Sequence, residues 1–161
     1  MKGPRAAEVL RQLGLHVPAR PNTWAPLRAE DGDDSPNVIG RLGNTEFFIE
    51  EQDAAPGIAA LELRLASERG IYPVLREDFS VVLGGARARE ALAEVCNVDF
   101  GALSGADKPV VMTLMTGVAV LVLPQQDTFR IWCDPSFGSY LWETLAEVAK
   151  AMTSTTTGRQ E

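Results

Sequence analysis

The order of apolar patterns over residues 79–152 constrains the fold more than any other feature of this sequence. An apolar run at residues 79–83 leads through Gly84-Gly85 into an Ala-rich helical pattern at residues 86–95. Three strand-like runs and a final helical pattern follow, and the runs are residues 110–114, 118–123 and 129–133. Such a series buries its apolar faces well when an antiparallel sheet carries helices on one face. The sequence therefore predicts an α+β fold with an antiparallel-rich sheet.

The last strand and helix are FRIWCDPSFGSYLWETLAEVAKAM, residues 129–152, with Asp134 and Pro135 between them. An aspartate accepts hydrogen bonds from the first free N–H groups of a helix, and proline is well suited to the first helical position. We therefore expect the helix to begin at this pair. An apolar stripe on the helix is assigned to the core, and it consists of Phe137, Leu141, Leu145, Val148 and Met152.

The first half of the chain has a weaker pattern. Residues 5–13 predict a short amphipathic helix that ends at Gly14. The Pro-, Asp- and Asn-rich stretch at residues 16–37 has no period and predicts an extended connection. A hairpin is expected from residues 38–42 and 45–50, joined by a tight turn at Gly43-Asn44, because this dipeptide suits positive φ angles.

The segment between this hairpin and residue 79 allows more than one interpretation. Residues 53–57 predict a loop, and residues 58–66 predict a helix ended by Gly70, although the leucines at 61, 63 and 65 also alternate as in a strand. Residues 71–75 predict a strand near a sheet edge, because they contain Pro73.

Length and composition predict one domain with tails. The chain has 161 residues, of which 45% are hydrophobic and 23% charged, which is typical of a globular protein with a single core. We expect an N-terminal helix and extended arm at residues 1–37, an α+β domain at 38–152 and a flexible polar tail at 153–161.

Charge and hydropathy exclude some classes of partner and location. The formal net charge is -7 and no basic stripe interrupts it, so nucleic acid is not expected as a partner. The longest apolar run, residues 117–124, is strand-sized and too short to cross a bilayer. Residues 1–24 are amphipathic and carry interspersed arginines, unlike a secretory signal. A cytoplasmic location without membrane contact is expected.

Residue types needed for catalysis are scarce. His16 is the only histidine and falls in a segment expected to be peripheral, so a Ser or Cys nucleophile would lack its usual imidazole base. Cys96 and Cys133, at a helix end and in a strand, are expected to be reduced and packed, and they are too few for a zinc or iron-sulfur site. The sequence predicts no catalytic, cofactor-binding or metal-binding residue in this chain.

Two weaker signals have plainer interpretations. VLGGAR at residues 82–87 could receive a phosphate at a helix N-terminus, but a tight strand-to-helix turn explains the glycines as well. The acidic cluster at residues 30–34 lacks the spacing of a calcium loop and predicts a solvated charge run.

The aromatic residues are the remaining candidates. Tryptophans stack flat ligands well, but they also fill cores and interfaces. We expect contacts to another subunit from five of the aromatic residues, namely Trp132, Phe137, Tyr140, Trp142 and Trp24.

Four stretches together resemble one family. FSVVLGGARAREALAEVCNVDF at residues 79–100 is similar to the strand, Gly-containing turn and helix of the glycine-cleavage T-protein fold, with Cys96, Asn97 and Asp99 placed as in the sarcosine oxidase γ-subunit branch. VVMTLMTGVAVLVL and IGRLGNTEFFIE are similar to two hairpins of that fold. FRIWCDPSFGSYLWETL resembles the branch's closing strand and helix, whose Ser-x-x-x-Tyr-Leu-Trp signature is represented by Ser136, Tyr140, Leu141 and Trp142. The resemblance spans residues 38–152.

This resemblance implies a non-catalytic γ subunit of a heterotetrameric sarcosine oxidase-like flavoenzyme. Such a complex demethylates sarcosine or another N-methyl amino acid oxidatively and transfers the one-carbon unit to tetrahydrofolate. The resemblance implies α, β and δ subunits as partners. These subunits hold FAD, FMN, NAD, tetrahydrofolate and zinc, and the resemblance implies no cofactor in this chain. An alternative is a stand-alone folate-binding module of the same fold, in which Asp99 or Glu46 would hold the pterin ring. A third alternative is a degenerate domain of this fold that forms a homo-oligomer.

Overall fold

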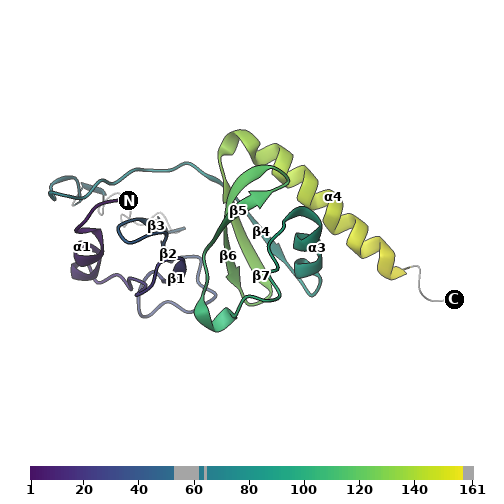
Figure 1. Cartoon of the computed structure of the whole chain (residues 1–161), viewed down its shortest axis with the longest axis horizontal. Coiled ribbons are helices and arrows are strands. Elements are labelled where there is room, and N and C mark those ends of the chain that lie inside the picture. Colours follow the sequence, from purple (N-terminus) through teal and green to yellow (C-terminus); the bar gives the residue numbers. More distant parts are fainter. Residues whose placement is uncertain (53–61, 64, 158–161) are drawn as a thin grey trace. The chain divides into compact units, whose positions relative to one another are not determined.

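The computed structural model describes residues 1–52, 62–63 and 65–157 of the 161-residue chain. The chain divides into two compact units, Met1–Arg76 and Glu77–Glu161. Both units combine helix with an antiparallel sheet (Figure 1). The α+β class predicted from the sequence is therefore confirmed.

The first unit has a three-stranded sheet and a short helix. Its sheet has the order β1-β2-β3, and both strand pairs are antiparallel. The elements are α1 (Ala6–Gln12), β1 (Thr23–Pro26), β2 (Val38–Arg41) and β3 (Phe47–Glu50). The helix packs on the sheet through a buried apolar cluster of Ala6, Leu10, Ala25, Leu27, Ile39 and Phe47.

The outer edge of β3 is covered by the beginning of the chain. The backbone N–H of Phe47 donates to the carbonyl oxygen of Met1 at 2.9 Å, and that of Gly3 donates to Thr45 at the same distance. On the other side, Lys2 and Tyr72 exchange two backbone hydrogen bonds, 3.0 and 2.7 Å long. These bonds satisfy backbone groups that an open sheet edge would leave free.

Three predictions for the first half need correction. A strand, β1, lies inside the segment expected to be an irregular connection, because pairing with β2 supplies the hydrogen bonds that the local pattern did not indicate. The predicted hairpin of β2 and β3 is confirmed, but its turn is not tight. The backbone N–H groups of Leu42 and Gly43 both donate to the carbonyl oxygen of Glu46, and neither Gly43 nor Asn44 has a positive φ.

The third correction concerns residues 71–75, which form no strand. Only Tyr72 pairs, in the bridge to Lys2, and Pro73 has no N–H with which to extend the ladder. The loop predicted at residues 53–57 and most of the helix predicted at 58–66 lie outside the described residues. The described residues 62, 63, 65 and 66 are helical.

The second unit follows the predicted order of strand, helix, three strands and helix. Its sheet has the order β4-β7-β6-β5, and all three strand pairs are antiparallel. The elements are β4 (Phe79–Gly84), α3 (Ala88–Val95), β5 (Val111–Met115), β6 (Val118–Gln125), β7 (Thr128–Cys133) and α4 (Gly138–Thr157), with single 3-10 turns at Gly105–Asp107 and Pro135–Phe137.

Both helices of this unit cover the same face of the sheet, as predicted (Figure 1). Alternate strand residues point to that face and pack against the buried stripes of α3 and α4. The cluster includes Val81, Leu92, Val95, Met115, Val120, Val122, Phe129, Ile131, Cys133, Leu141 and Leu145. The helices therefore lie on the face that carries the most apolar residues.

Tight turns set the register of this sheet. Thr116 and Gly117 have φ angles of 48° and 86°, as a two-residue hairpin between β5 and β6 requires. Gln126 has a φ of 54° in the equally short turn between β6 and β7. Both turns fall in the gaps between the strand-like runs at residues 110–114, 118–123 and 129–133.

The beginning and end of α4 differ from the prediction. Phe137 was expected in the core stripe, but it is half exposed. Residues 135–137 form a 3-10 turn, so the helical phase that places Leu141 and Leu145 in the core does not extend back to Phe137. The helix also continues to Thr157, so residues 153–157 are helical where a frayed tail was expected. Residues 158–161 lie outside the described part of the chain.

Candidate interaction surface

Three aromatic side chains at the start of α4 are the best candidates for contacts to a partner. Phe137, Tyr140 and Trp142 are 50%, 51% and 55% exposed, respectively. Large apolar side chains exposed close together on a soluble protein usually mark a binding surface. Phe137 is the last residue of the 3-10 turn, and Tyr140 and Trp142 are the third and fifth residues of α4.

The strand end before α4 positions these aromatics. Asp134 follows β7, and its carboxylate accepts a hydrogen bond from the backbone N–H of Ser136 at 2.9 Å. The Ser136 hydroxyl donates to the same carboxylate oxygen, and this bond together with the backbone bond holds the pKa of the Asp134 carboxyl below its ordinary value, because both favour the charged form. The 3-10 turn that begins at Pro135 then leads into the helix. The position of the aromatics thus follows from a local cap that the sequence predicted.

Tyr140 and Trp142 lie on opposite flanks of the buried stripe of α4. Successive helical residues are separated by 100°, so Leu141 lies 100° from each of the two side chains on the buried side of the helix. Measured around the other side, Tyr140 and Trp142 point about 160° apart. The Tyr140 hydroxyl donates to the carbonyl oxygen of Thr116 at 3.3 Å, in the turn between β5 and β6. Trp142 therefore points to the flank of α4 that faces away from this turn.

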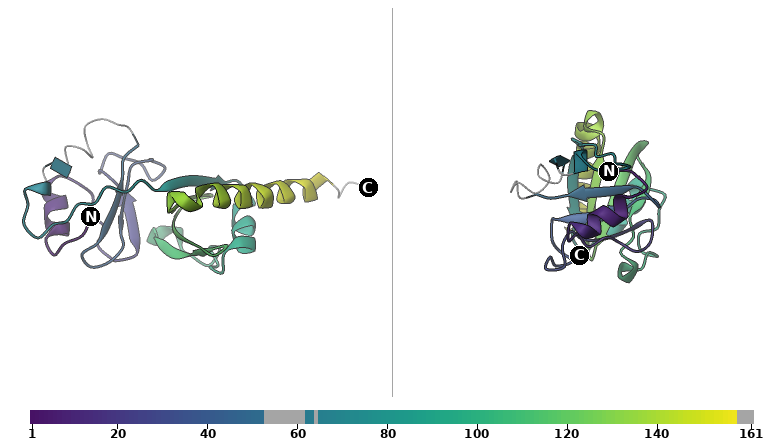
Figure 2. Two further views of the ribbon diagram at one scale, coloured as in Figure 1. Left: turned by 90° about the horizontal axis from the view of Figure 1, so that it is seen from above. Right: turned by 90° about the vertical axis from the view of Figure 1, so that its left-hand side faces the viewer.

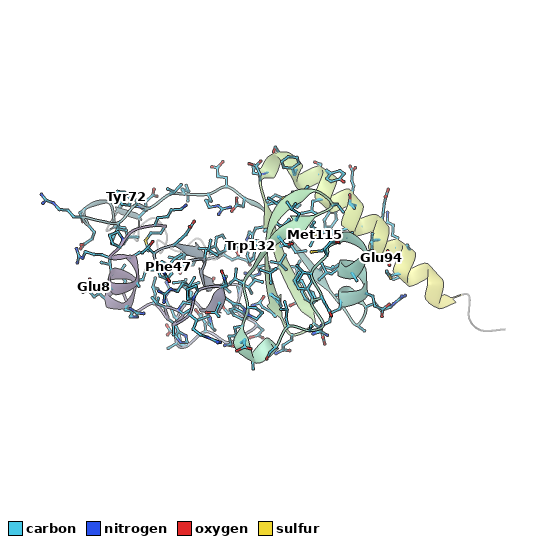
Figure 3. The ribbon with its side chains drawn as sticks, in the orientation of Figure 1. Glu8, Phe47, Tyr72, Glu94, Met115 and Trp132 are labelled. Atoms are coloured by element: carbon cyan, nitrogen blue, oxygen red, sulfur yellow. The ribbon has the colours of Figure 1, made fainter. Side chains whose placement is uncertain are left out.

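The other two predicted interface residues are buried. Trp24 on β1 and Trp132 on β7 are only 4% and 3% exposed. Trp132 lies on the sheet face opposite to that of Met115, and the two side chains can be compared in Figure 3. The Arg130 guanidinium lies 5.7 Å from the centre of the Trp132 ring. A buried ring offers a partner very little area, and the residue type alone did not indicate this burial.

Further exposed apolar residues lie on the strands and were not among the candidates. Val82 on β4 is 59% exposed, and Met112 and Leu114 on β5 are exposed as well. All three point away from the face that the helices cover, as the strand registers show. The runs at residues 79–83 and 110–114 are almost continuously apolar, so alternation gave no signal for the exposed members.

The carboxylates proposed as pterin contacts have partners within their own units. One Asp99 oxygen accepts hydrogen bonds from the backbone N–H groups of Gly101 and Ala102, at 2.8 and 3.2 Å. The Glu46 carboxylate pairs with the Lys2 ammonium at 3.0 Å. Asp99 belongs to the second unit and Glu46 to the first. In these positions both carboxylates stabilise local structure.

Cys133 has a thiol of low reactivity. The side chain is buried, and its pKa is raised by burial first and then by the negative charges of Asp134 and Asp78. Cys96 is buried at the C-terminal end of α3. Among the described residues, no group of three or more His, Cys, Asp or Glu side chains is placed to bind a metal ion.

The Gly-rich and acidic segments have structural explanations. Gly85 has a φ of +115° in the turn between β4 and α3, a conformation that side chains rarely adopt, and its carbonyl oxygen accepts from the N–H of Ala88. In the acidic segment, Asp31 accepts a hydrogen bond from the backbone N–H of Arg28 at 2.9 Å.

These features define the chain as an α+β protein with antiparallel sheets and an exposed aromatic surface at the start of α4. Within the described residues, none of the helices has the length and apolar character needed to cross a membrane. No protein-family model and no curated protein matches the sequence.

Proposed function

We propose that this chain is a non-catalytic γ-type subunit of a heterotetrameric sarcosine oxidase-like flavoenzyme, in which it supports assembly and stability. The exposure of Trp142 is the observation that carries this proposal. Trp142 is the last residue of the Ser-x-x-x-Tyr-Leu-Trp signature, and tryptophan is among the residues most enriched at the centres of interfaces.

The other three signature residues have roles inside the second unit. Ser136 donates its backbone N–H to Asp134, Tyr140 donates to Thr116, and Leu141 is fully buried in the core. Each of them contributes to folding of the unit. Trp142 is more than half exposed, so its large ring is available to a partner.

The order of elements in the second unit also supports the proposal. A strand and helix followed by three antiparallel strands and a helix is the order implied by the resemblance to the T-protein folate-binding domain over residues 79–152. In the proposed complex, flavin, NAD and tetrahydrofolate belong to the α and β subunits and zinc to the δ subunit. The substrate is sarcosine or another N-methyl amino acid, and the complex is cytoplasmic.

Co-expression tests this proposal directly. The full chain is produced together with the α, β and δ subunits of a sarcosine oxidase-like flavoenzyme, and the products are separated by size-exclusion chromatography. We expect the chain to elute with the flavin absorbance at a fixed ratio. Leaving the chain out is expected to shorten the half-life of sarcosine oxidation at elevated temperature, with little change in the rate per flavin. A stable monomer that joins no flavoprotein would refute the proposal.

The folate-binding alternative is tested by calorimetry. Tetrahydrofolate at millimolar concentration is titrated into the isolated chain, with Asp99→Ala and Glu46→Ala as variants. The proposed subunit role predicts no heat of binding, because both carboxylates are engaged in local contacts. A saturable heat that either variant removes would favour the stand-alone module instead.

A further inference from the structure

The outer edge of β4 presents backbone groups to which a further strand can pair. Gln125 on β6 and Thr128 on β7 flank a two-residue turn and so form a hydrogen-bonded pair. Along antiparallel strands such pairs alternate with pairs whose backbone N–H and C=O groups point away from each other. The backbone groups of Phe129, Ile131 and Cys133 therefore point to β4. Their partners on β4 are Leu83, Val81 and Phe79, so the backbone N–H and C=O groups of the intervening residues Ser80, Val82 and Gly84 point outward.

This edge carries none of the features that usually protect an open strand. Natural proteins block edges with charged side chains, proline or bulges, whereas β4 has the sequence FSVVLG and pairs without a bulge. Ser80, Val82 and Gly84 are all exposed. An unprotected edge of this kind either aggregates or is covered by another strand.

Two other edges of this chain are paired over part of their length. Residues 1–3 pair with β3 in the first unit. In the second unit, Cys96 forms a bridge with Met115 at the end of β5, and the N–H of Thr116 donates to Val95 at 2.9 Å. Among the described residues, β4 has β7 as its only neighbour in the sheet. The outer edge of β4 therefore differs from those of β3 and β5, each of which has some backbone pairing.

Trp142 lies on the same side of the unit as this edge. The helix α4 contacts β4, and it runs beside β4 when the molecule is seen from above (Figure 2, left), with α3 on the other side of α4. Tyr140 points toward the turn between β5 and β6, the two strands that lie farthest from β4 in the sheet. Because Trp142 points about 160° away from Tyr140, it faces the β4 side.

We propose that the outer edge of β4, together with Trp142, binds an extended strand of a partner subunit. The partner strand is uncharged where it pairs with Ser80, Val82 and Gly84, and it places an apolar side chain against Trp142. This assignment rests on the proposed function, because it takes the partner to be another subunit of that complex.

The charges near the edge indicate the chemistry of the partner strand. Glu77 lies two residues before β4, and Asp134 follows Cys133, which pairs with Phe79 at the same end of β4. A basic residue at the corresponding end of the partner strand would neutralise this acidic end. In a second copy the first basic residue after β4 is Arg87, which already pairs with Glu90 at 2.7 Å, so a partner subunit that brings its own basic residue fits this edge better than a second copy of β4.

Proline scanning of the two sheet edges tests the site with a matched control. Val82→Pro removes an N–H that points outward and so leaves the pairing with β7 intact, since proline is tolerated on edge strands with that orientation. Met112→Pro is the control, because Met112 is exposed and its N–H points outward from β5, at the other edge. Val82→Lys is a second variant that keeps the N–H and adds a charge, and circular dichroism shows whether each variant folds.

The readout is assembly of the full chain with the co-expressed flavoprotein subunits, together with hydrogen exchange. In the complex, the amide hydrogens of Ser80, Val82 and Gly84 are expected to exchange with solvent at least about tenfold more slowly than in the free chain. Val82→Pro and Val82→Lys are expected to weaken assembly about tenfold or more, whereas Met112→Pro leaves it unchanged.

Four results would overturn the site. Strand addition is excluded if the three amides exchange in the complex as they do in the free chain. It is also excluded if the Val82 and Met112 variants lose assembly equally. Neither result contradicts the proposed function. A free chain that dimerises with protection of the same amides makes a second copy the occupant. If no complex forms at all, the proposed function and this site fail together.

Discussion

The carboxylate of Asp134 accepts a hydrogen bond from the backbone N–H of Ser136, 2.9 Å away, and so determines where β7 ends and helical structure begins. The hydroxyl of Ser136 donates to the same oxygen, and this bond first and the backbone bond second lower the pKa of Asp134 in the folded protein, because both are strongest to a charged carboxylate. The cap is therefore linked to pH.

Asp134→Ala is expected to lower the urea midpoint of unfolding at pH 7. A carboxyl whose pKa is lowered by folding stabilises the protein above its unfolded pKa of about 3.9, and the contribution is lost as the pH falls through the folded pKa. The difference in urea midpoint between wild type and the Asp134→Ala variant should thus become smaller below about pH 4. Glu143→Ala, an exposed change on the same helix, is the control, and a difference that stays constant with pH would contradict the linkage.

Gly3→Ala is expected to unfold or strongly destabilise the first unit. A Cβ at this position would lie 2.2 Å from the carbonyl oxygen of Gly70, and the φ of +144° is unfavourable for any side chain. A loss of about 3 kcal/mol or more in the free energy of unfolding is expected. Gly14→Ala is the matched control, because its φ is also positive but nothing lies within 4 Å, and it should cost about 1 kcal/mol. Similar losses in both variants would show that the contact with Gly70 is not tight.

Leu141 and Trp142 are neighbours on α4 with opposite expected effects. Leu141 is fully buried, and Leu141→Ala should reduce the free energy of unfolding of the isolated chain by about 2–5 kcal/mol. Trp142→Ala should change it by no more than about 0.5 kcal/mol, because the ring is more than half exposed, but it should weaken assembly with the flavoprotein subunits. Thermal denaturation and size-exclusion chromatography measure the two quantities. Equal destabilisation by both changes would mean that Trp142 belongs to the core.

The thiols of Cys133 and Cys96 are expected to resist alkylation in the native protein. Both side chains are buried, and the raised pKa of Cys133 leaves less of the reactive thiolate at neutral pH. Intact-mass spectrometry after treatment with iodoacetamide at pH 7.5 should show no label in buffer and two labels in 8 M urea, conditions that differ only in whether the chain is folded. Labelling of the folded protein would show that one of the two sites opens readily.

Much of the second unit was predictable because its signals are local. The turn at Thr116-Gly117, the Ala-rich stripe of α3 and the cap at Asp134 are each encoded within a few residues, and the structure contains all three. In the first unit, β1 was missed because four residues that include a proline carry little pattern. Its strand conformation depends on pairing with β2, which lies more than ten residues later in the chain.

Exposure of individual side chains was harder to predict than secondary structure. Of five aromatic interface candidates, the structure places Phe137, Tyr140 and Trp142 at the surface and buries Trp24 and Trp132. Tryptophan occurs on both sides of this division, so residue type carried no signal for it. The difference arises from which face of its strand or helix each residue occupies and from what packs there.

The sequence by itself determined the α+β class, the order of elements in the second unit and the turns that join its strands, because periodicity, glycine placement and caps act over short distances. Only the tertiary structure decided the strand order β4-β7-β6-β5, and with it that β4 lies at an edge. Strand order depends on which apolar faces pack together across the whole unit, and no local pattern records that choice.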